Sequence, residues 1–346
     1  EELLSTGLNA KFYAERWTFN ADLSYSEATG ESDNFRVVTG LAPLSMIGEG
    51  GDPVAGYTIS YSAINSPTLS SSVDLSEASN WAAHEYVRDI GKTEDEMLGF
   101  HFDAEMEFDE GGSDIFTPTT LKTGIRFSDR EKTLTSLSNY EYSIFSATDT
   151  SALSDEDVLH IGRPEGGPAW AIFDPRRLRD TRFNGITPNI NTESENLLLL
   201  GSGVIKETNS SIYAELSFEG DWGVPVIGNI GVRYVETESD SPGWSTPATR
   251  TVPAERISAS NSYDEILPSV NLQFALSESH FVRAAAGRVI ARAPIDELRS
   301  TRTYQNLDSS NRSGSSGNPF LLPTKADQAS LSYEWYANES TSLTVA

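Results

Sequence analysis

The chain has 346 residues, of which 38% are hydrophobic, and its 51 acidic residues against 25 basic ones give a formal net charge of −26. This apolar content is enough for an ordered fold, whereas the acidic excess repels phosphate backbones, so we expect no nucleic-acid partner. The absence of cysteine excludes a disulfide framework, a thiolate metal site and a cysteine nucleophile.

No stretch of the sequence approaches the roughly 20 apolar residues that a membrane-spanning helix requires. Residues 196–205 come nearest and are far too short, so a helical membrane span is excluded. The first ten residues lack the basic start and apolar middle of a signal peptide. We therefore expect a mature chain, a cytosolic one or an excised piece of a longer protein, and the two chain ends favour the last of these.

Residues 17–26 alternate strictly between apolar and polar side chains, with Trp17 and Phe19 on one face and Asn20 and Asp22 on the other. A period of two predicts a β-strand with one oily face. The same alternation recurs in residues 98–108, 121–129, 210–218, 226–234, 267–276 and 328–336. The sequence predicts about ten strands and no convincing amphipathic helix.

The predicted connections between these strands alternate between short and long. Tight turns fall near residues 15–16, 109–114, 220–225, 277–280 and 337–342. Long excursions lie between them, at residues 27–96, 129–207, 237–263 and 291–325. Short turns at one end of a sheet and long loops at the other are typical of an outer-membrane barrel, whereas a soluble sandwich has no reason for this asymmetry.

Tryptophan positions and charge indicate what the oily face contacts. Trp17, Trp222 and Trp335 lie at or beside three of the tight turns, in phase with the oily face, which predicts an aromatic girdle at one membrane interface. The opposite face suits a watery lumen, since it carries Asp22, Asp103, Glu105, Glu107, Lys122, Arg126, Glu215 and Arg233. We predict an all-β fold: an antiparallel transmembrane β-barrel, here a partial barrel of about ten strands with long outer loops. The alternative is a soluble antiparallel protein whose tryptophans form its core.

Several stretches together resemble the barrel of TonB-dependent outer-membrane receptors. They are residues 121–132, 171–178, 223–238, 263–294 and 317–340. Gly317, Asn318, Pro319 and Pro323, which lead into the strand containing Trp335, carry most of the weight. In this order and spacing the stretches extend over about two thirds of the chain. They resemble most the large proteobacterial branch linked to glycan uptake.

The resemblance implies a barrel of about 22 strands, plugged by an N-terminal domain, that binds a scarce nutrient outside and imports it with energy from TonB. It implies as partners outer-membrane lipid, the TonB complex through the plug region of the parent protein, and a small-molecule or oligosaccharide ligand. The implied location is the outer membrane of a Gram-negative bacterium. About ten strands cannot close so wide a barrel. We therefore expect residues 1–346 to be a partial barrel domain, without a plug domain and without the C-terminal strands, whose transport function belongs to a longer parent.

The sequence gives no indication of catalysis. The four histidines, at positions 84, 101, 160 and 280, are scattered without a partnered nucleophile. His101 lies among the acids of the predicted lumen and is interpreted as a hydrated wall residue. Glu105 and Glu107 have a spacing that a glycosidase uses, but wall residues of any polar lumen share it. We expect no enzyme activity.

Acidic clusters in the predicted outer loops offer oxygen ligands. Residues 27–96 contain twelve acidic side chains, and residues 154–158 add a second group. Carboxylates of this kind bind calcium, although no EF-hand spacing is present. We expect no cofactor; calcium in these acidic outer loops is the alternative to a solvated acidic surface.

The long loops contain aromatic side chains that no predicted strand uses. Flat rings bury apolar area at low entropic cost and suit both sugar rings and aromatic siderophores. Residues 174–180 join arginines to an Asp-Pro pair that predicts a turn, and these arginines suit ligand hydroxyls or carboxylates. The candidate ligand-binding residues are Trp81, Tyr86, Trp170, Phe173, Arg176, Arg177, Trp244 and Tyr304. The alternative is that these residues anchor the loops to one another.

The sequence therefore predicts part of an outer-membrane receptor for TonB-dependent uptake of a scarce nutrient. A glycan is favoured as ligand, because a strongly acidic protein repels anionic chelates. The alternatives are a ferric-siderophore receptor of the same family, a complete small porin or adhesin, and a soluble β-rich carbohydrate-binding module.

Overall fold

The computed structural model describes residues 1–41, 57–62, 65–109, 112–143, 152–163, 167–183, 192–245, 252–305, 313–338 and 340–346. The chain falls into two compact units. The sheet unit comprises Glu1–Gly30, Lys92–Thr135 and Leu199–Ala346. The loop unit comprises Glu31–Gly91 and Ser136–Leu198.

Most of the described residues are in β-strands, and two α-helices accompany them. The strands are β1 (Glu2–Ala14), β2 (Trp17–Leu41), β3 (Tyr57–Ser62), β4 (Asn65–Ser71), β5 (Trp81–Glu107), β6 (Thr117–Ser143), β7 (Val158–Gly162), β8 (Trp170–Phe173), β9 (Gly203–Asp221), β10 (Pro225–Ser245), β11 (Glu255–Ser277), β12 (His280–Ala291), β13 (Arg302–Gln305), β14 (Ser313–Ser316), β15 (Thr324–Asn338) and β16 (Thr341–Val345). The helices are α1 (Pro175–Arg182) and α2 (Thr192–Gly201), with 3-10 turns at Ala78–Asn80, Asp155–Asp157 and Ile295–Leu298.

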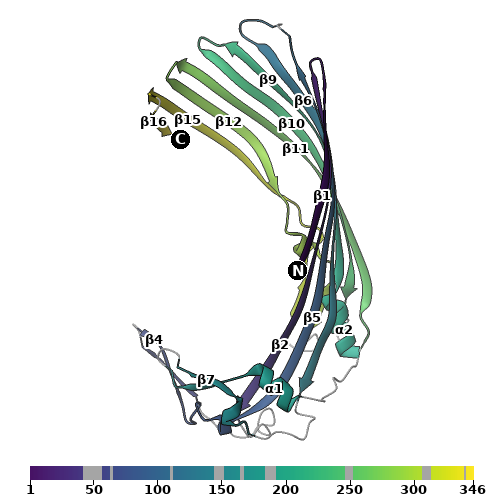
Figure 1. The fold of residues 1–346 in the computed structure, drawn as a ribbon, viewed down its shortest axis with the longest axis vertical. Helices are drawn as coiled ribbons and strands as arrows, with labels where there is room; N and C mark the ends of the chain where they lie inside the picture. The colour runs from purple at the N-terminus through teal and green to yellow at the C-terminus, as the bar shows by residue number, and fades with distance from the viewer. Residues whose placement is uncertain are drawn as a thin grey trace. The chain divides into compact units, whose positions relative to one another are not determined.

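The long strands form one antiparallel sheet in the order β1-β2-β5-β6-β9-β10-β11-β12-β15-β16, in which each strand pairs with the next long strand of the sequence (Figure 1). β13 lies off this path and pairs with β10 and β14. Because every antiparallel step reverses the chain, the short connections after β1, β5, β9, β11 and β15 share one edge of the sheet. The longer connections share the other edge. The predicted all-β antiparallel fold and its alternation of short and long connections are confirmed.

The strand register places the apolar half of each alternation on one face. Leu216 pairs with Ile230, and Ile230 pairs with Val270, and cross-strand partners of this kind share a face. Most large apolar side chains of this face are open, with Ile212 54% exposed and Leu331 66% exposed, whereas Phe218 near the short-connection edge is buried. A continuous band of exposed apolar side chains is how a barrel wall meets lipid.

The three tryptophans of the predicted girdle all lie at the edge with the short connections. Trp222 and Trp335 are exposed, and Trp17 is half-buried. Trp17 stacks on Phe19 with ring centroids 5.8 Å apart, and Trp335 stacks on His280 at 6.0 Å. The soluble alternative requires these tryptophans to meet in a closed interior, and they do not.

Several strands run further than the alternation predicted. β2 continues to Leu41, β5 begins at Trp81 and β6 continues to Ser143, so the expected long excursions 27–96 and 129–207 are shorter than predicted. Hydrophobic periodicity detects a strand only where its two faces differ in polarity. Beyond Gly30 the alternation of β2 is irregular, because Asp33 and Thr39 share a face with Phe35 and Val37, so the periodicity is weak there.

The two helices correct the expectation that the chain has none. The Asp-Pro pair that predicted a turn begins α1 instead: the Asp174 side chain accepts hydrogen bonds from the backbone N–H groups of Arg176 (2.9 Å) and Arg177 (3.3 Å). Proline at the first helical position costs nothing, because that N–H has no partner within a helix. No helix in the described ranges is both long and apolar enough to cross a membrane.

Each unit has its own packed core. The core of the loop unit contains Leu75, Trp81, Ala83, Tyr86, Leu153, Ala171, Leu178 and Phe183. The smaller core of the sheet unit is formed by Ile205, Ile295 and Leu298. Many large apolar side chains of the main sheet lie outside these two cores and are exposed.

The lipid assignment predicts unequal costs for arginine at two adjacent positions of β9. Leu216→Arg places a charge on the apolar face near the middle of the strand and should cost about 2–4 kcal/mol of folding free energy in a bilayer. Glu215→Arg changes a luminal position and should cost much less. Reversible unfolding of the intact parent protein from lipid vesicles measures both values, and equal penalties would contradict the assignment.

Candidate functional site

The core of the loop unit brings four of the predicted ligand-binding aromatics together. The Trp81 ring lies 6.2 Å from that of Trp170 and 5.9 Å from that of Phe173, measured between centroids. Tyr86 packs on Phe183 at 5.5 Å. The Trp81 indole N–H donates to the backbone oxygen of Leu75 at 3.1 Å.

Burial separates these aromatics into two groups. Trp81 and Tyr86 are each only 7% exposed, so packing covers most of each ring. Trp170 and Phe173 are half-buried and keep some open surface. The buried indole nitrogen of Trp170 has no hydrogen-bond partner in the described structure.

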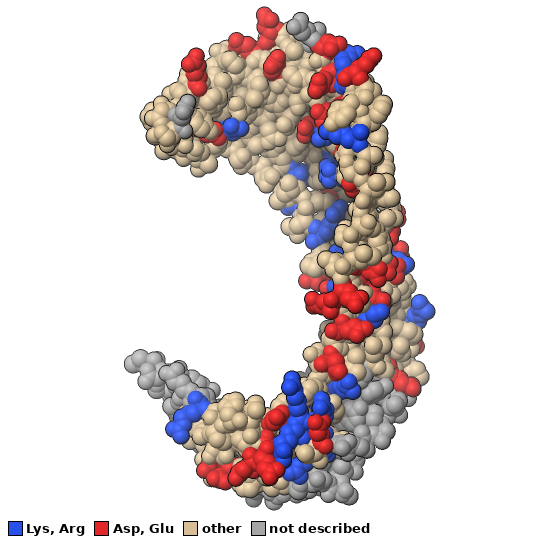
Figure 2. All heavy atoms as spheres, viewed as in Figure 1, with Lys and Arg blue, Asp and Glu red and all other residues tan. Residues whose placement is uncertain are grey.

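Two of the four arginines of α1 contact one buried carboxylate. Asp157 is 2% exposed and accepts hydrogen bonds from Arg177 (3.2 Å) and Arg182 (3.3 Å), while Arg177 also contacts Glu156 at 2.5 Å. Acidic and basic side chains alternate on this part of the surface (Figure 2). The predicted ligand residue Arg177 is therefore already paired. The neighbouring Arg176 is exposed, and its backbone N–H donates to the Asp174 side chain in the helix cap.

The environment of Asp157 lowers the pKa of its carboxyl group. Burial alone works to raise that pKa, but the hydrogen bonds that stabilise the charged form outweigh burial. The strongest come from the backbone and hydroxyl of Ser154, followed by those from Arg182 and Arg177. Asp157 thereby joins the 3-10 turn before β7 to helix α1.

The remaining two predicted residues belong to the sheet unit. Trp244 lies in β10, and its backbone N–H donates to the Thr301 hydroxyl at 3.3 Å. Tyr304 lies in β13, where its backbone pairs with Gly314 of β14. The eight predicted residues are thus divided between two units, six in the loop unit and two in the sheet unit.

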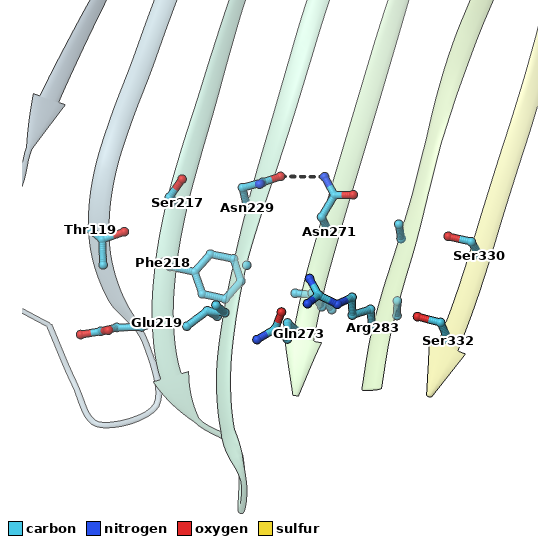
Figure 3. A pocket seen from close by; sticks show the side chains of 15 residues that line it. Thr119, Ser217, Phe218, Glu219, Asn229, Asn271, Gln273, Arg283, Ser330 and Ser332 are labelled. Carbon is cyan, nitrogen blue, oxygen red and sulfur yellow. Dashed lines mark hydrogen bonds between the residues drawn. The ribbon is translucent and has the colours of Figure 1, made fainter. Parts of the chain in front are cut away.

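The sheet unit contains a hollow of about 660 Å³ on its polar face, which we call the amide hollow (Figure 3). Its polar lining comes from Thr119, Ser217, Glu219, Asn229, Asn271, Gln273, Arg283, Ser330 and Ser332. The Asn271 amide donates to the Asn229 side-chain oxygen at 2.8 Å, and Arg283 donates to Glu334 at 2.9 Å. Neutral amides and hydroxyls therefore dominate a surface that both donates and accepts hydrogen bonds.

The register explains why this surface is hollow. Ser217 pairs with Asn229, Asn229 with Asn271, Asn271 with Ala285 and Ala285 with Ser330, so one row of short side chains crosses β9, β10, β11, β12 and β15. The alternation of residues 226–234 puts Asn229 on the polar face but does not align it with residues of other strands. Only the register joins residues that lie far apart in the chain.

The family comparison agrees with this geometry. A family model described as "TonB dependent receptor-like, beta-barrel" matches residues 4–346. The chain therefore belongs to the TonB-dependent receptor β-barrel family. This is a family of outer-membrane receptors and transporters of Gram-negative bacteria rather than of enzymes.

Solved structures give remote likenesses. The ferric-catecholate import receptor Fiu of E. coli K12 in its closed form matches with a TM-score of 0.49 and 13% identity over 98% of this chain and 39% of that one. The ferric citrate transporter FecA matches with a TM-score of 0.33 and 12% identity over 96% of this chain and 40% of that one. A double mutant of the Serratia marcescens hemophore receptor HasR, in complex with hemophore HasA and heme, matches with a TM-score of 0.38 and 8% identity over 96% of this chain and 42% of that one. A comparison with curated proteins gives no match.

The chain spans about two fifths of the length of these solved receptors. Within the described residues, no three His, Asp or Glu side chains gather as ligands for a metal ion. Residues 42–56, which include part of the first acidic loop, lie outside the described residues. Calcium binding by the acidic loops stays a prediction.

The buried carboxylate predicts a pH-dependent loop unit. Because the folded-state pKa of Asp157 is lowered, the stability that its charged carboxylate contributes is present above the unfolded-state pKa of about 3.9. This stability is lost as the pH falls through the folded-state pKa. Asp157→Asn should lower the stability of the loop unit by about 1–3 kcal/mol at pH 7 and should make that stability less dependent on pH in the acid range. Hydrogen exchange of residues 152–163 in the intact parent measures the effect.

Asp180→Asn is the matched control, since Asp180 forms an exposed ion pair with Arg179 at 2.7 Å. Its effect on exchange should be much smaller. Equal loss of protection in the two variants would show that burial of Asp157 has no special role.

Proposed function

We propose that the longer protein containing this chain is an outer-membrane receptor that imports a nutrient with energy from TonB, and that its ligand is a glycan. Membership of the TonB-dependent receptor family supports import. The amide hollow supports the choice of ligand. Its neutral donors and acceptors match sugar hydroxyls, which also donate and accept hydrogen bonds.

The loop unit supplies a separate contact surface in this proposal, independent of the amide hollow. Trp170 and Phe173 are half-buried, and Arg176, the second residue of helix α1, is exposed. A ring fixed by packing against Trp81 loses little entropy when it stacks on a sugar, because its orientation is already set. In this proposal Trp81 and Tyr86 support the surface as part of the core against which Trp170 and Phe173 pack, and they do not contact the ligand.

Removing one amide of the hollow should weaken glycan binding. Asn271→Leu deletes a donor and an acceptor while keeping side-chain size, and should raise the dissociation constant about five-fold, near 1 kcal/mol. Asn9→Leu is the control, because Asn9 forms a comparable cross-strand amide pair with Asn20 at 3.0 Å outside the hollow. Titration calorimetry of the intact receptor against an oligosaccharide panel measures both. Unchanged binding in Asn271→Leu would remove the hollow from the proposal.

The aromatic contact gives a separate test that also distinguishes a glycan from a ferric siderophore. Trp170→Ala should weaken oligosaccharide binding by about 1–3 kcal/mol, by analogy with stacking platforms for planar rings, and Arg176→Ala should matter less. Trp170→Phe keeps a ring against Trp81 and should retain most of the affinity. Calorimetry at two salt concentrations, with oligosaccharides and ferric chelates, provides the measurement. Tight, salt-sensitive chelate binding that survives Trp170→Ala would overturn the glycan proposal.

A further inference from the structure

A second hollow of the sheet unit, about 260 Å³ in volume, is lined by three arginines from different parts of the sequence. Arg126 lies in β6, Arg233 lies in β10 and Arg292 directly follows β12. Ser128 and Ser211 add hydroxyl groups to the lining. We call this surface the arginine hollow.

The sheet register places two of these arginines on one face, on either side of β9. Arg126 pairs with Ser211, and Arg233 pairs with Tyr213 two residues further along the same strand β9. Residues two apart on a strand point to the same face, so Arg126 and Arg233 stand in adjacent rows of the polar face. Arg292 reaches the next row, where its Nε donates to the Thr237 hydroxyl at 3.3 Å.

A tyrosine between the strands positions Arg233. The guanidinium carbon lies 5.1 Å from the centre of the Tyr213 ring, and the Tyr213 hydroxyl donates to Asp103 at 2.5 Å. The ring lies directly over Gly124, where an added Cβ would come within 2.7 Å of it. Asp103 is thus bonded to the tyrosine, and Arg233 keeps its N–H groups for other partners.

The arginine hollow differs from the rest of the chain in its charge pairing. Elsewhere the described basic side chains commonly pair with carboxylates, as Arg16 does with Asp109 and Arg130 with Asp95. Within the described residues, neither Arg126, Arg233 nor Arg292 forms an ion pair, although the chain has 51 acidic residues against 25 basic ones. Three like charges around one hollow repel each other, and an anion between them removes that repulsion.

We propose that the arginine hollow binds an oxyanion, namely a carboxylate or phosphate group carried by a solute that moves along the barrel wall. Guanidinium groups bind the oxygens of such anions in pairs, and the two serine hydroxyls supply further donors. A space of about 260 Å³ accommodates a charged head group and leaves the remainder of a larger solute outside. The site rests on the luminal position of this face and does not depend on the glycan proposal.

The position of the arginine hollow along the strands fits a role in binding a passing solute. Arg126 and Arg233 lie nine and eight residues beyond the first residues of β6 and β10. With a rise of about 3.3 Å per residue and a strand tilt of about 45°, they stand roughly 20 Å from the edge with the short turns. The amide hollow lies nearer that edge, so the two surfaces are separate.

Calorimetry of the intact receptor with three anionic probes tests the site: inorganic phosphate, citrate and trigalacturonic acid. At least one probe should bind, and its dissociation constant should rise about ten-fold or more in Arg126→Gln and in Arg233→Gln. The probe that binds most tightly identifies the source of the group as free phosphate, a chelating acid or an acidic sugar. A neutral galactose trisaccharide should bind both variants as it binds the wild type.

Arg130→Gln is the matched control, since Arg130 lies on the same strand and face but is paired with Asp95 at 2.6 Å. Anion binding should be unchanged in this variant, and Arg233→Lys, which keeps the charge, should restore part of it. Heat-modifiable electrophoretic mobility confirms that each barrel is folded. The proposal is overturned if no anion binds, if both glutamine variants bind as tightly as the wild type, or if Arg130→Gln weakens binding equally.

Discussion

The backbone hydrogen-bond ladder between neighbouring strands is the interaction on which the rest of this structure depends. In a bilayer each unpaired N–H or C=O group costs several kcal/mol, so a spanning strand must be paired along its length. β9 and β10 pair without a shift from Pro225↔Asp221 to Asp240↔Lys206. Because side chains alternate with a period of two, a slip of one residue would turn Arg233 toward lipid and Val232 into the lumen. Register thus fixes both the lipid-facing surface and every luminal site.

A strand can be predicted from the sequence where its two faces lie in different surroundings. Residues 210–218 and 226–234 lie between lipid and a polar interior, and their alternation predicts strands that the structure confirms. In the extension of β2 to Leu41, the polar residues Asp33 and Thr39 share a face with Phe35 and Val37, so periodicity marks it only weakly. Helix α1 is not predicted by the sequence, because Asp174 and Pro175 suit a turn and a helix start equally well. The hydrogen bonds of the helix cap distinguish the two in the structure.

The candidate sites were harder to predict than the strands, because a sequence does not show what covers a side chain. An aromatic residue in a long loop fits a ligand platform or a packing anchor, and packing covers most of the Trp81 and Tyr86 rings while Trp170 keeps open surface. The amide hollow depends on Asn229 and Asn271, which are adjacent only through the pairing of β10 with β11. The approach of Arg292 to Thr237 likewise joins positions that no local pattern connects.

Net charge by itself is a weak guide to the ligand of this protein. A charge of −26 argues against an anionic ligand only if the protein acts as a single distant charge. At physiological ionic strength the Debye length is about 8 Å, so acids on remote strands contribute little at a luminal site. A solute at such a site interacts mainly with the nearest side chains. Arg126 and Arg233 are two of these, and within the described residues neither has a carboxylate partner. The local balance of paired and unpaired charges, rather than the total, therefore determines which solutes the wall attracts.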